Sequence, residues 1–442
     1  MSSTFDLSRH AVTPQWQFAA RRWATGLLVV LAAALLLVTY ARSITTGGLD
    51  YSAYFDAGNW VRQGHSIYER SLLWRDVGYA PEYPMPKPDG MAFLYPPAFA
   101  VAIVPFTYLS IDTGFAIWLG ILFVTLVAST WVVLDTLFPK LSRTTLLTLT
   151  VIGSAVAAFF QPMRTILITG QVDVALIMLM ALALRAFVKR QDMRVAVLLG
   201  VAIAIKPTIG FLVLFLLWKR AYRAAIYCCV IAGVLLLVPF AITGGVQGVL
   251  EYIAVSSYAS GPGFDVSPIN QSPWGLLLRF FTPNAYTVPF VVAPLVPTIG
   301  RIIIGLATLG GLSLLVKRSR TLPVTQQALE YSLVIIGLLV AGPLSEAGHY
   351  GYLLIAIVAM VAALTQTPLS TKVRYGLAGA LVLLFGYLSL PSLTPIDCVF
   401  FEYWQAPVAG AKVLLTGMHV YGLLAMTALA CVTLWQTRQA RT

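Results

Sequence analysis

The feature that most constrains this chain is a succession of long apolar runs separated by short polar stretches. A transmembrane helix needs roughly 20 apolar residues, within a range of about 17 to 25. The pattern therefore predicts an all-α, polytopic membrane protein that forms one integral membrane domain over residues 1–442. The candidate segments are 23–41, 92–109, 113–137, 144–160, 169–188, 194–205, 207–218, 223–241, 289–316, 327–342, 350–366, 373–391 and 411–435.

Charge is scarce and unevenly placed. Only 10% of the residues are charged and 59% are hydrophobic, whereas soluble proteins carry about 25% charged residues. A net charge of +12 would suggest a nucleic-acid partner in a soluble protein. Here the basic residues gather between apolar runs, which indicates the positive-inside rule instead, and we expect no nucleic acid. The clusters are Lys189-Arg190 with Arg194, Lys219-Arg220 with Arg223, Lys317-Arg318 with Arg320, Lys372 with Arg374, and Arg438 with Arg441.

These clusters also predict how the chain crosses the plasma membrane. Arg21-Arg22 place the N-terminus in the cytoplasm, before a first run long enough to be an uncleaved span. The outside then holds a large first loop at 42–91 and a second at 242–288. Thirteen crossings cannot leave both termini inside, so one segment in 92–168 fails to cross or the two short runs around Lys206 make one pass. We expect about 12 transmembrane helices.

The first outside loop begins with GGLDYSAYFDAG, which places Asp50 shortly after the first span. A carboxylate here can act as a general base on a hydroxyl group, and partial burial among aromatic residues would raise its pKa. The alternative is a solvated residue at the membrane rim, which is what most such carboxylates are. For Asp56 we expect the cap of a following helix.

Other ionisable residues stand at the ends of apolar runs. In AIAIKPTIGF, Lys206 lies between two runs too short to span alone, where it can hold a phosphate as a point charge or extend to the interface. In GPLSEAGHY, Glu346 and His349 fall at one helix end, and a structural hydrogen-bonded pair is the alternative there. In ITGQVDVAL, Gln171 and Asp173 either face a polar cavity or cap a helix.

With this topology, polar residues from distant segments converge on the outer side of the membrane. The four histidines show no H-x-x-x-H spacing and no D-x-D occurs, so we expect no metal and no other cofactor. Tyr95 precedes the prolines of FLYPPAFA, which suit the first turn of a helix. The predicted cleft consists of Asp50, Tyr54, Asp56, Tyr95, Gln171, Lys206, Asn270, Gln271, Glu346 and His349.

In their order along the chain, these stretches resemble a known family. They are DYSAYFDAG with QGHSIY, FLYPPAFA, GQVDVAL, AIAIKPTIGF, SPINQSPWG and GPLSEAGHY. The set is similar to the integral membrane glycosyltransferases of the GT-C superfamily, specifically the family 87 type that includes the PimE-like mannosyltransferases. Two departures stand out: Asp173 occupies a position where the family commonly has Asn, and His349 alone remains of a pair of histidines.

The resemblance implies a fold with a large first extracytoplasmic loop and an activity on that side of the membrane. It implies transfer of a hexose, mannose in such relatives, from a polyprenyl phosphate to a hydroxyl of a glycolipid or glycan, with inversion at the anomeric carbon. By the same resemblance Asp50 is the base. Lys206 and His349 are candidates for binding the donor phosphate, which needs charge stabilisation rather than a protonating acid.

Two rival readings belong to other classes. A transporter or flippase of a lipid-linked sugar would also have many spans and a polar cleft, but such proteins are marked by inverted repeats and ionisable residues at the midplane. We find no repeat and little midplane charge apart from Lys206. A membrane scaffold without catalysis is the second rival. Transfer of radiolabel from the lipid donor separates both from an enzyme.

Overall fold

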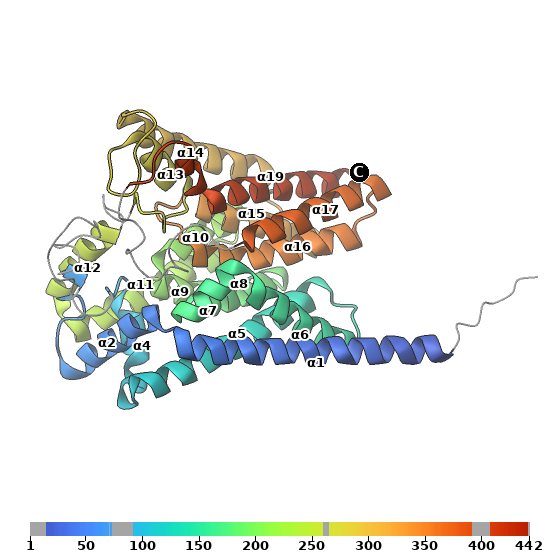
Figure 1. Ribbon diagram of the computed structural model, residues 1–442, viewed down its shortest axis with the longest axis horizontal. Coiled ribbons are helices and arrows are strands. Elements are labelled where there is room, and N and C mark those ends of the chain that lie inside the picture. Colours follow the sequence, from blue (N-terminus) through green and yellow to red (C-terminus); the bar gives the residue numbers. More distant parts are fainter. Residues whose placement is uncertain (1–14, 70, 73–91, 260–264, 391–406, 441–442) are drawn as a thin grey trace, which may run out of the picture.

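The computed structural model describes residues 15–69, 71–72, 92–259, 265–390 and 407–440 (Figure 1). Over these ranges the chain is helical, and the one β-type pairing is an isolated bridge between Thr287 and Val408. The all-α prediction is therefore confirmed. The helices run largely along one direction and form an elongated bundle (Figure 1).

The elements follow the apolar runs, with short 3-10 helices (η) at several junctions. In chain order they are α1 (Gln15–Thr46), α2 (Leu49–Gln63), α4 (Pro97–Ile103), η1 (Val104–Tyr108), α5 (Ile111–Leu137), α6 (Arg143–Phe159), α7 (Gln161–Thr169), α8 (Asp173–Val188), α9 (Asp192–Ile205), η2 (Pro207–Gly210), α10 (Phe211–Trp218), α11 (Tyr222–Thr243), α12 (Gly245–Ala259), α13 (Pro273–Phe281), α14 (Leu295–Leu315), α15 (Val324–Ala341), η3 (Ala347–Tyr352), α16 (Leu353–Gln366), α17 (Thr371–Leu388), α18 (Lys412–Leu415) and α19 (Met418–Gln439).

The chain is a polytopic membrane protein with fewer long helices than expected. Within the described ranges, seven helices are long and apolar enough to cross a bilayer, or eight if α6 and α7, which meet at 81°, make one span. The predicted 12 spans are not confirmed. Several apolar runs form short helices, such as the 14 residues of α9, and about 21 Å of helix falls short of a 30 Å hydrocarbon core. Helix α9 instead buries Leu199 and Ala202 against neighbouring helices.

The basic clusters lie together at one end of the bundle. Lys219, between α10 and α11, binds Glu330 of α15, and Arg438 of α19 binds the other oxygen of this carboxylate at 2.7 Å. Arg320 pairs with Asp192 at 2.6 Å. Figure 1 shows the start of α1 and the C-terminus at the same end. The segments predicted to face the cytoplasm therefore share one end, which we call the basic end.

Both predicted outside loops contain helices. The first, 42–91, carries the last turn of α1 and then α2, while its Pro-rich half at 73–91 lies outside the described residues. The second, 242–288, contains α12 and α13. Figure 1 shows α2 and α12 at the end of the bundle away from the termini, which we call the site end.

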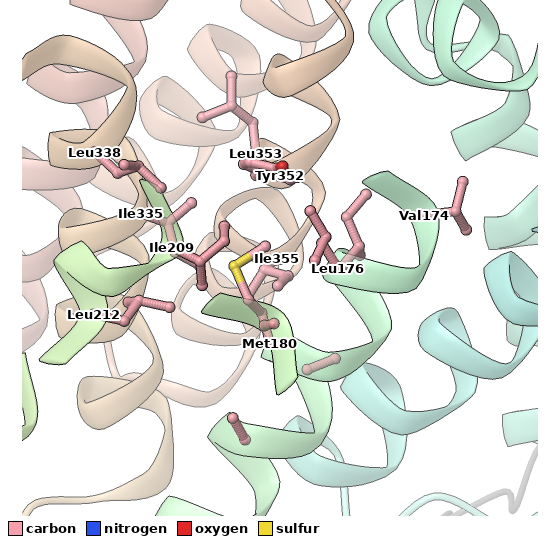
Figure 2. Close-up of a cluster of buried hydrophobic side chains, with 14 of the residues drawn as sticks. Val174, Leu176, Met180, Ile209, Leu212, Ile335, Leu338, Tyr352, Leu353 and Ile355 are labelled. Carbon is pink, nitrogen blue, oxygen red and sulfur yellow. The ribbon is translucent and has the colours of Figure 1, made fainter. Parts of the chain in front are cut away.

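A buried apolar core joins the two ends. Side chains from four segments meet in it: Met180 of α8, Leu212 of α10, Ile335 of α15 and Ile355 of α16 (Figure 2). All of them are almost fully buried. Tyr352, at the end of η3, borders this cluster and carries a hydroxyl that reaches the polar residues described next. The core thus supports the polar site directly.

Candidate functional site: a buried polar cluster at one end of the bundle

Asp50 lies in the first turn of α2, directly after a sharp turn from α1. Gly48 has a φ of 103°, in the left-handed region that favours glycine. A Cβ at Gly47 would overlap the carbonyl oxygen of Ile168 in α7, and the same oxygen accepts the N–H of Gly48 at 2.8 Å. The two glycines therefore seat the start of α2 against α7 and bring Asp50 beside the polar residues at the end of α7.

Tyr54 and Tyr95 form an aromatic wall of the site. The Tyr54 hydroxyl donates to the Tyr95 hydroxyl at 3.1 Å, and the rings meet edge to face with centroids 5.3 Å apart. Pro96 caps α4 with extended backbone, so the predicted helix start at the two prolines is confirmed. The ring of Tyr95 lies 5.7 Å from Nζ of Lys206, a cation–π distance. The wall therefore borders the cation of the site.

Lys206 interrupts the helical path between α9 and α10, as the sequence predicts. Its backbone is extended, with φ −139° and ψ 98°. Its ammonium donates to both carboxylate oxygens of Asp173, at 2.9 and 3.2 Å, and Tyr352 donates its hydroxyl to the same carboxylate. Asp173 is fully buried. Its charge is therefore compensated by one ammonium and one hydroxyl, as a buried carboxylate requires.

His349 completes this group from η3. Its Nε2 lies 2.6 Å from Nζ of Lys206, and its Nδ1 accepts the backbone N–H of Glu346 at 3.1 Å. Because Nδ1 is an acceptor, the proton of a neutral imidazole belongs on Nε2. An imidazole N–H and an ammonium then face each other, and both are donors. An anionic oxygen placed against this pair would accept from both.

Two carboxyl groups outside the membrane-spanning helices have a raised pKa. Burial is the main reason that the pKa of Asp50 rises from 3.8 to about 6, and the charge of Asp173 adds to it. Hydrogen bonds from Thr169 and Gln171 limit this rise. Burial likewise raises the pKa of Glu346 to about 7, and Glu346 accepts a hydrogen bond from Gln171 at 3.2 Å. Gln171 therefore connects the two carboxyl groups.

Two predicted cleft residues are engaged elsewhere. The side-chain amide of Asn270 donates to the carbonyl oxygens of Asp265 and Pro343, at 3.0 and 2.9 Å. The amide of Gln271 donates to Pro268 and Thr416, at 2.7 and 2.8 Å. Both side chains tie loops together beside the segment that leads into η3. Their role in substrate binding stays a prediction.

The predicted role of Asp56 as a helix cap is wrong. Helix α2 begins at Leu49 with Gly48 as its N-cap, so Asp56 lies in the middle of the helix and is half-buried. The residue before the helix is Gly48, which has no side chain to cap it. The sequence therefore contained no capping signal at the true start of α2. The sequence predicted that the helix starts just after Asp56, whereas it starts at Leu49.

Sequence reasoning left open whether Asp173 faces a polar cavity or caps a helix, did not foresee its pairing with Lys206, and assigned no role to Tyr352 or Thr169. A signal for Asp173 was present in the helix lengths. Helices α8 and α9 have 16 and 14 residues and are joined by a short turn, so the residue that starts α8 lies level with the residue that follows α9. These residues are Asp173 and Lys206. Tyr352 and Thr169 gave no comparable signal.

Within the ranges that the structure describes, no group of three His, Cys, Asp or Glu side chains is arranged to hold a metal ion. The polar cluster instead offers one ammonium, one imidazole, three tyrosine hydroxyls and several carboxyl groups. Such a set can bind an anion at Lys206 and His349 and accept a proton at Asp50. The expectation that no metal or cofactor takes part stays a prediction.

The fold and this cluster define a class: a helical membrane protein with a buried, charged site at one end of its bundle. The family model of glycosyltransferase family 87 matches residues 93–343, more than half of the chain. The chain belongs to this family. No curated protein and no solved structure matches the chain.

The family match covers only some of the residues of the site. The matched range contains Tyr95, Gln171, Asp173 and Lys206, whereas Asp50 and His349 lie outside it. Family membership makes the protein a glycosyltransferase, with a sugar donor and an acceptor as its substrates, and it does not favour the transporter reading. It leaves open the donor, the sugar and the role of each side chain.

Proposed function

We propose that the protein is an inverting hexosyltransferase that uses a polyprenyl-phosphate sugar, with mannose as the expected hexose, and glycosylates a hydroxyl of a glycolipid or glycan. The observation that carries the proposal is that Asp50 lies within reach of the charge of Lys206, whose ammonium contacts His349. The three come from different parts of the chain, before, within and beyond the range matched by the family. A phosphate group and a proton acceptor can therefore act at one place.

The phosphate of the lipid donor is the anion that suits Lys206 and His349. These two donors lie 2.6 Å apart. A phosphate oxygen beside the pair would accept a hydrogen bond from each of them, and the bond from the ammonium would be charge-assisted. A phosphomonoester leaving group carries negative charge of its own. Stabilising that charge is the main requirement for its departure.

Asp50 suits the role of base. A base works best when its pKa approaches the operating pH while it remains ionised, and a pKa of about 6 meets both conditions. The acceptor oxygen attacks the anomeric carbon, its proton passes to the Asp50 carboxylate, and the bond from that carbon to the phosphate oxygen breaks. A single displacement of this kind inverts the configuration at the anomeric carbon, and polyprenyl phosphate is the leaving group.

Asp173 is the positioning residue for Lys206. It accepts two hydrogen bonds from the ammonium and one from Tyr352, so it fixes where the cation lies. If Lys206 turned away from the site, it would leave the buried carboxylate of Asp173 uncompensated, which is energetically costly. Asn at this position would keep one acceptor without the charge, and it would hold Lys206 less firmly.

We further propose that the site faces the extracytoplasmic side of the plasma membrane, with the N-terminus in the cytoplasm. The support is that the site and the basic clusters lie at opposite ends of the bundle. Positively charged segments are retained in the cytoplasm. A lipid-linked sugar presented outside the cell would then meet Asp50 directly.

The test is transfer of radiolabel from polyprenyl-phosphate mannose to lipid or glycan, in membranes that carry this chain and in matched membranes without it. We expect labelled product only where the chain is present. A second measurement follows movement of the labelled donor between leaflets. Movement without any labelled product would support the transporter and would contradict the proposal.

A further inference from the structure

An apolar groove opens at the basic end of the bundle, far along α10 from Lys206. It has a volume of about 680 Å³. Helices α10 and α14 form its two walls and both pack against α15, which supplies Val334 to the floor. The lining is apolar along its length, with residues such as Phe211 and Leu214 on one side and Leu309 and Leu312 on the other.

The mouth of the groove carries two exposed arginines. Arg220 follows the end of α10, and Arg318 lies in the segment after α14. The guanidinium of Arg318 stacks over the ring of Trp218 at 4.7 Å, and the indole N–H of Trp218 donates to the carbonyl oxygen of Val316 at 2.6 Å. The indole thus fixes one wall to the other and holds a cation at the rim.

Glu330 and Asp192, two carboxylates at this end of the bundle, already form ion pairs with other basic side chains. Glu330 binds Lys219 and Arg438, and Asp192 binds Arg320. Among the described residues, neither Arg220 nor Arg318 forms an ion pair. Two cations without a carboxylate partner among the described residues therefore lie at the mouth of an apolar groove.

We propose that this groove binds a glycerophospholipid with an anionic headgroup, from the leaflet at the basic end. The phosphate and headgroup would lie against Arg220 and Arg318, and one acyl chain would follow α10. The eight residues of α10 extend about 12 Å, close to the depth of one leaflet. Basic pockets between transmembrane helices, with aromatic residues at the interface, are the chemistry that recognises such lipids.

A phospholipid is favoured over the polyprenyl phosphate donor because of the direction of the groove. Its cations lie at the basic end, whereas the donor phosphate is proposed to bind Lys206 at the site end. A lipid whose headgroup sits at Arg318 cannot also present a sugar to Asp50. The proposed lipid therefore acts as a bound structural partner, and its binding does not depend on transfer.

The experiment measures lipid retention by the purified, delipidated full chain in native mass spectrometry. The probes are dioleoyl phosphatidylglycerol and dioleoyl phosphatidylcholine, which share their acyl chains and differ in headgroup charge. We expect tighter binding of the glycerol lipid. Arg220→Gln and Arg318→Gln should each weaken it about 5-fold, whereas Lys372→Gln, an exposed base of α17 away from the groove, should leave it unchanged.

A second variant tests the groove with its charges intact. Leu309 is 47% exposed and lines the groove, so Leu309→Trp should fold and should reduce retention of both lipids. Equal binding of both lipids by the wild-type chain, or equal behaviour of the arginine variants and Lys372→Gln, would overturn the proposal. If Leu309→Trp retained both lipids fully, the lipids would be held by charge at the surface and not by the groove, which would also overturn the proposal. Displacement by polyprenyl phosphate that depends on the two arginines would assign the groove to the donor instead.

Discussion

The two ends of the bundle each contain a lysine paired with a fully buried carboxylate, and the two pairs differ in what surrounds them. Lys219 is fully buried, and Glu330 receives both it and Arg438. Lys206 is 14% exposed and faces Asp173 on one side and the Nε2 of His349 on the other. The first pair is closed, with every partner supplied by the protein. The second is open toward Asp50.

This difference separates a structural ion pair from a candidate site. A buried pair alone is weak support for either function or stability, since the cost of desolvation offsets much of the attraction. What distinguishes the site end is an excess of donors around one point together with a carboxyl group whose pKa lies near 6. The two lysine–carboxylate pairs can therefore be distinguished by whether hydrogen-bond donors around the lysine lack an acceptor.

The largest expected effect comes from Asp50→Asn. Asparagine keeps the shape of the side chain but cannot accept the proton of the acceptor hydroxyl, so turnover should fall about 10²–10⁴-fold. Asp56→Asn is the matched control, because Asp56 lies six positions further along the same helix and has no proposed part in the chemistry. Transfer rates in membranes at equal expression provide the measurement. The reverse pattern would exchange the roles of the two residues.

The two lysines provide the next comparison. Lys206→Met should raise the apparent KM for the lipid donor about 10- to 100-fold, as expected for loss of a hydrogen bond from a charged group, with little change in acceptor KM. Lys219→Met should instead lower the free energy of unfolding by about 3–5 kcal/mol. Activity is expressed per folded protein, so that loss of stability does not count as loss of binding. A shift of acceptor KM alone in Lys206→Met would remove this residue from the donor site.

A smaller effect is expected on the pH dependence. Asp50 works only when ionised, so kcat/KM should fall as the pH drops below about 6 and level off above it. The hydrogen bond from Gln171 lowers the pKa of Asp50. Gln171→Leu should therefore move the acid limb to higher pH. Gln326→Leu, the same change beside Glu330 at the basic end, should leave the limb in place, and an equal shift in both variants would exclude a specific role for Gln171.

The smallest perturbation tests on which side of the membrane the site lies. His65 is exposed just after α2, so His65→Cys should leave transfer unchanged. In a background without the native cysteines, an impermeant thiol reagent should label this cysteine in intact cells. Lys372→Cys, at the basic end, should react only after the membrane is opened. Labelling in the opposite order would invert the proposed topology.

Part of this arrangement was predictable from the sequence. Apolar runs indicated an all-α membrane protein, the break at Lys206 followed from two runs too short to span, and the basic clusters share one end as expected. The expected 12 spans are not confirmed, because hydropathy cannot tell a long helix in lipid from a short helix buried by protein. Helix α9 is apolar for the second reason, with Leu199 and Ala202 fully buried against its neighbours.

The site was predictable only in its most polar members. Asp50, Lys206 and His349 stood out because ionisable residues are rare in such a chain. In the structure Lys206 contacts His349, and its charge acts on Asp50. For Asp173 the sequence left open a polar cavity or a helix cap, and its pairing with Lys206 depends on the α8–α9 hairpin. Asn270 and Gln271 were expected in the cleft, but their amides are engaged by backbone carbonyls that no local pattern reveals.

The central claim is that Lys206 and His349 bind a lipid phosphate while Asp50 takes the proton. The most direct test is binding of a polyprenyl monophosphate to the purified chain, compared among wild type, Asp50→Asn and Lys206→Met. We predict that Asp50→Asn binds about as tightly as wild type and that Lys206→Met binds at least 10-fold more weakly. Undiminished binding by Lys206→Met, or loss of binding by Asp50→Asn alone, would contradict the account.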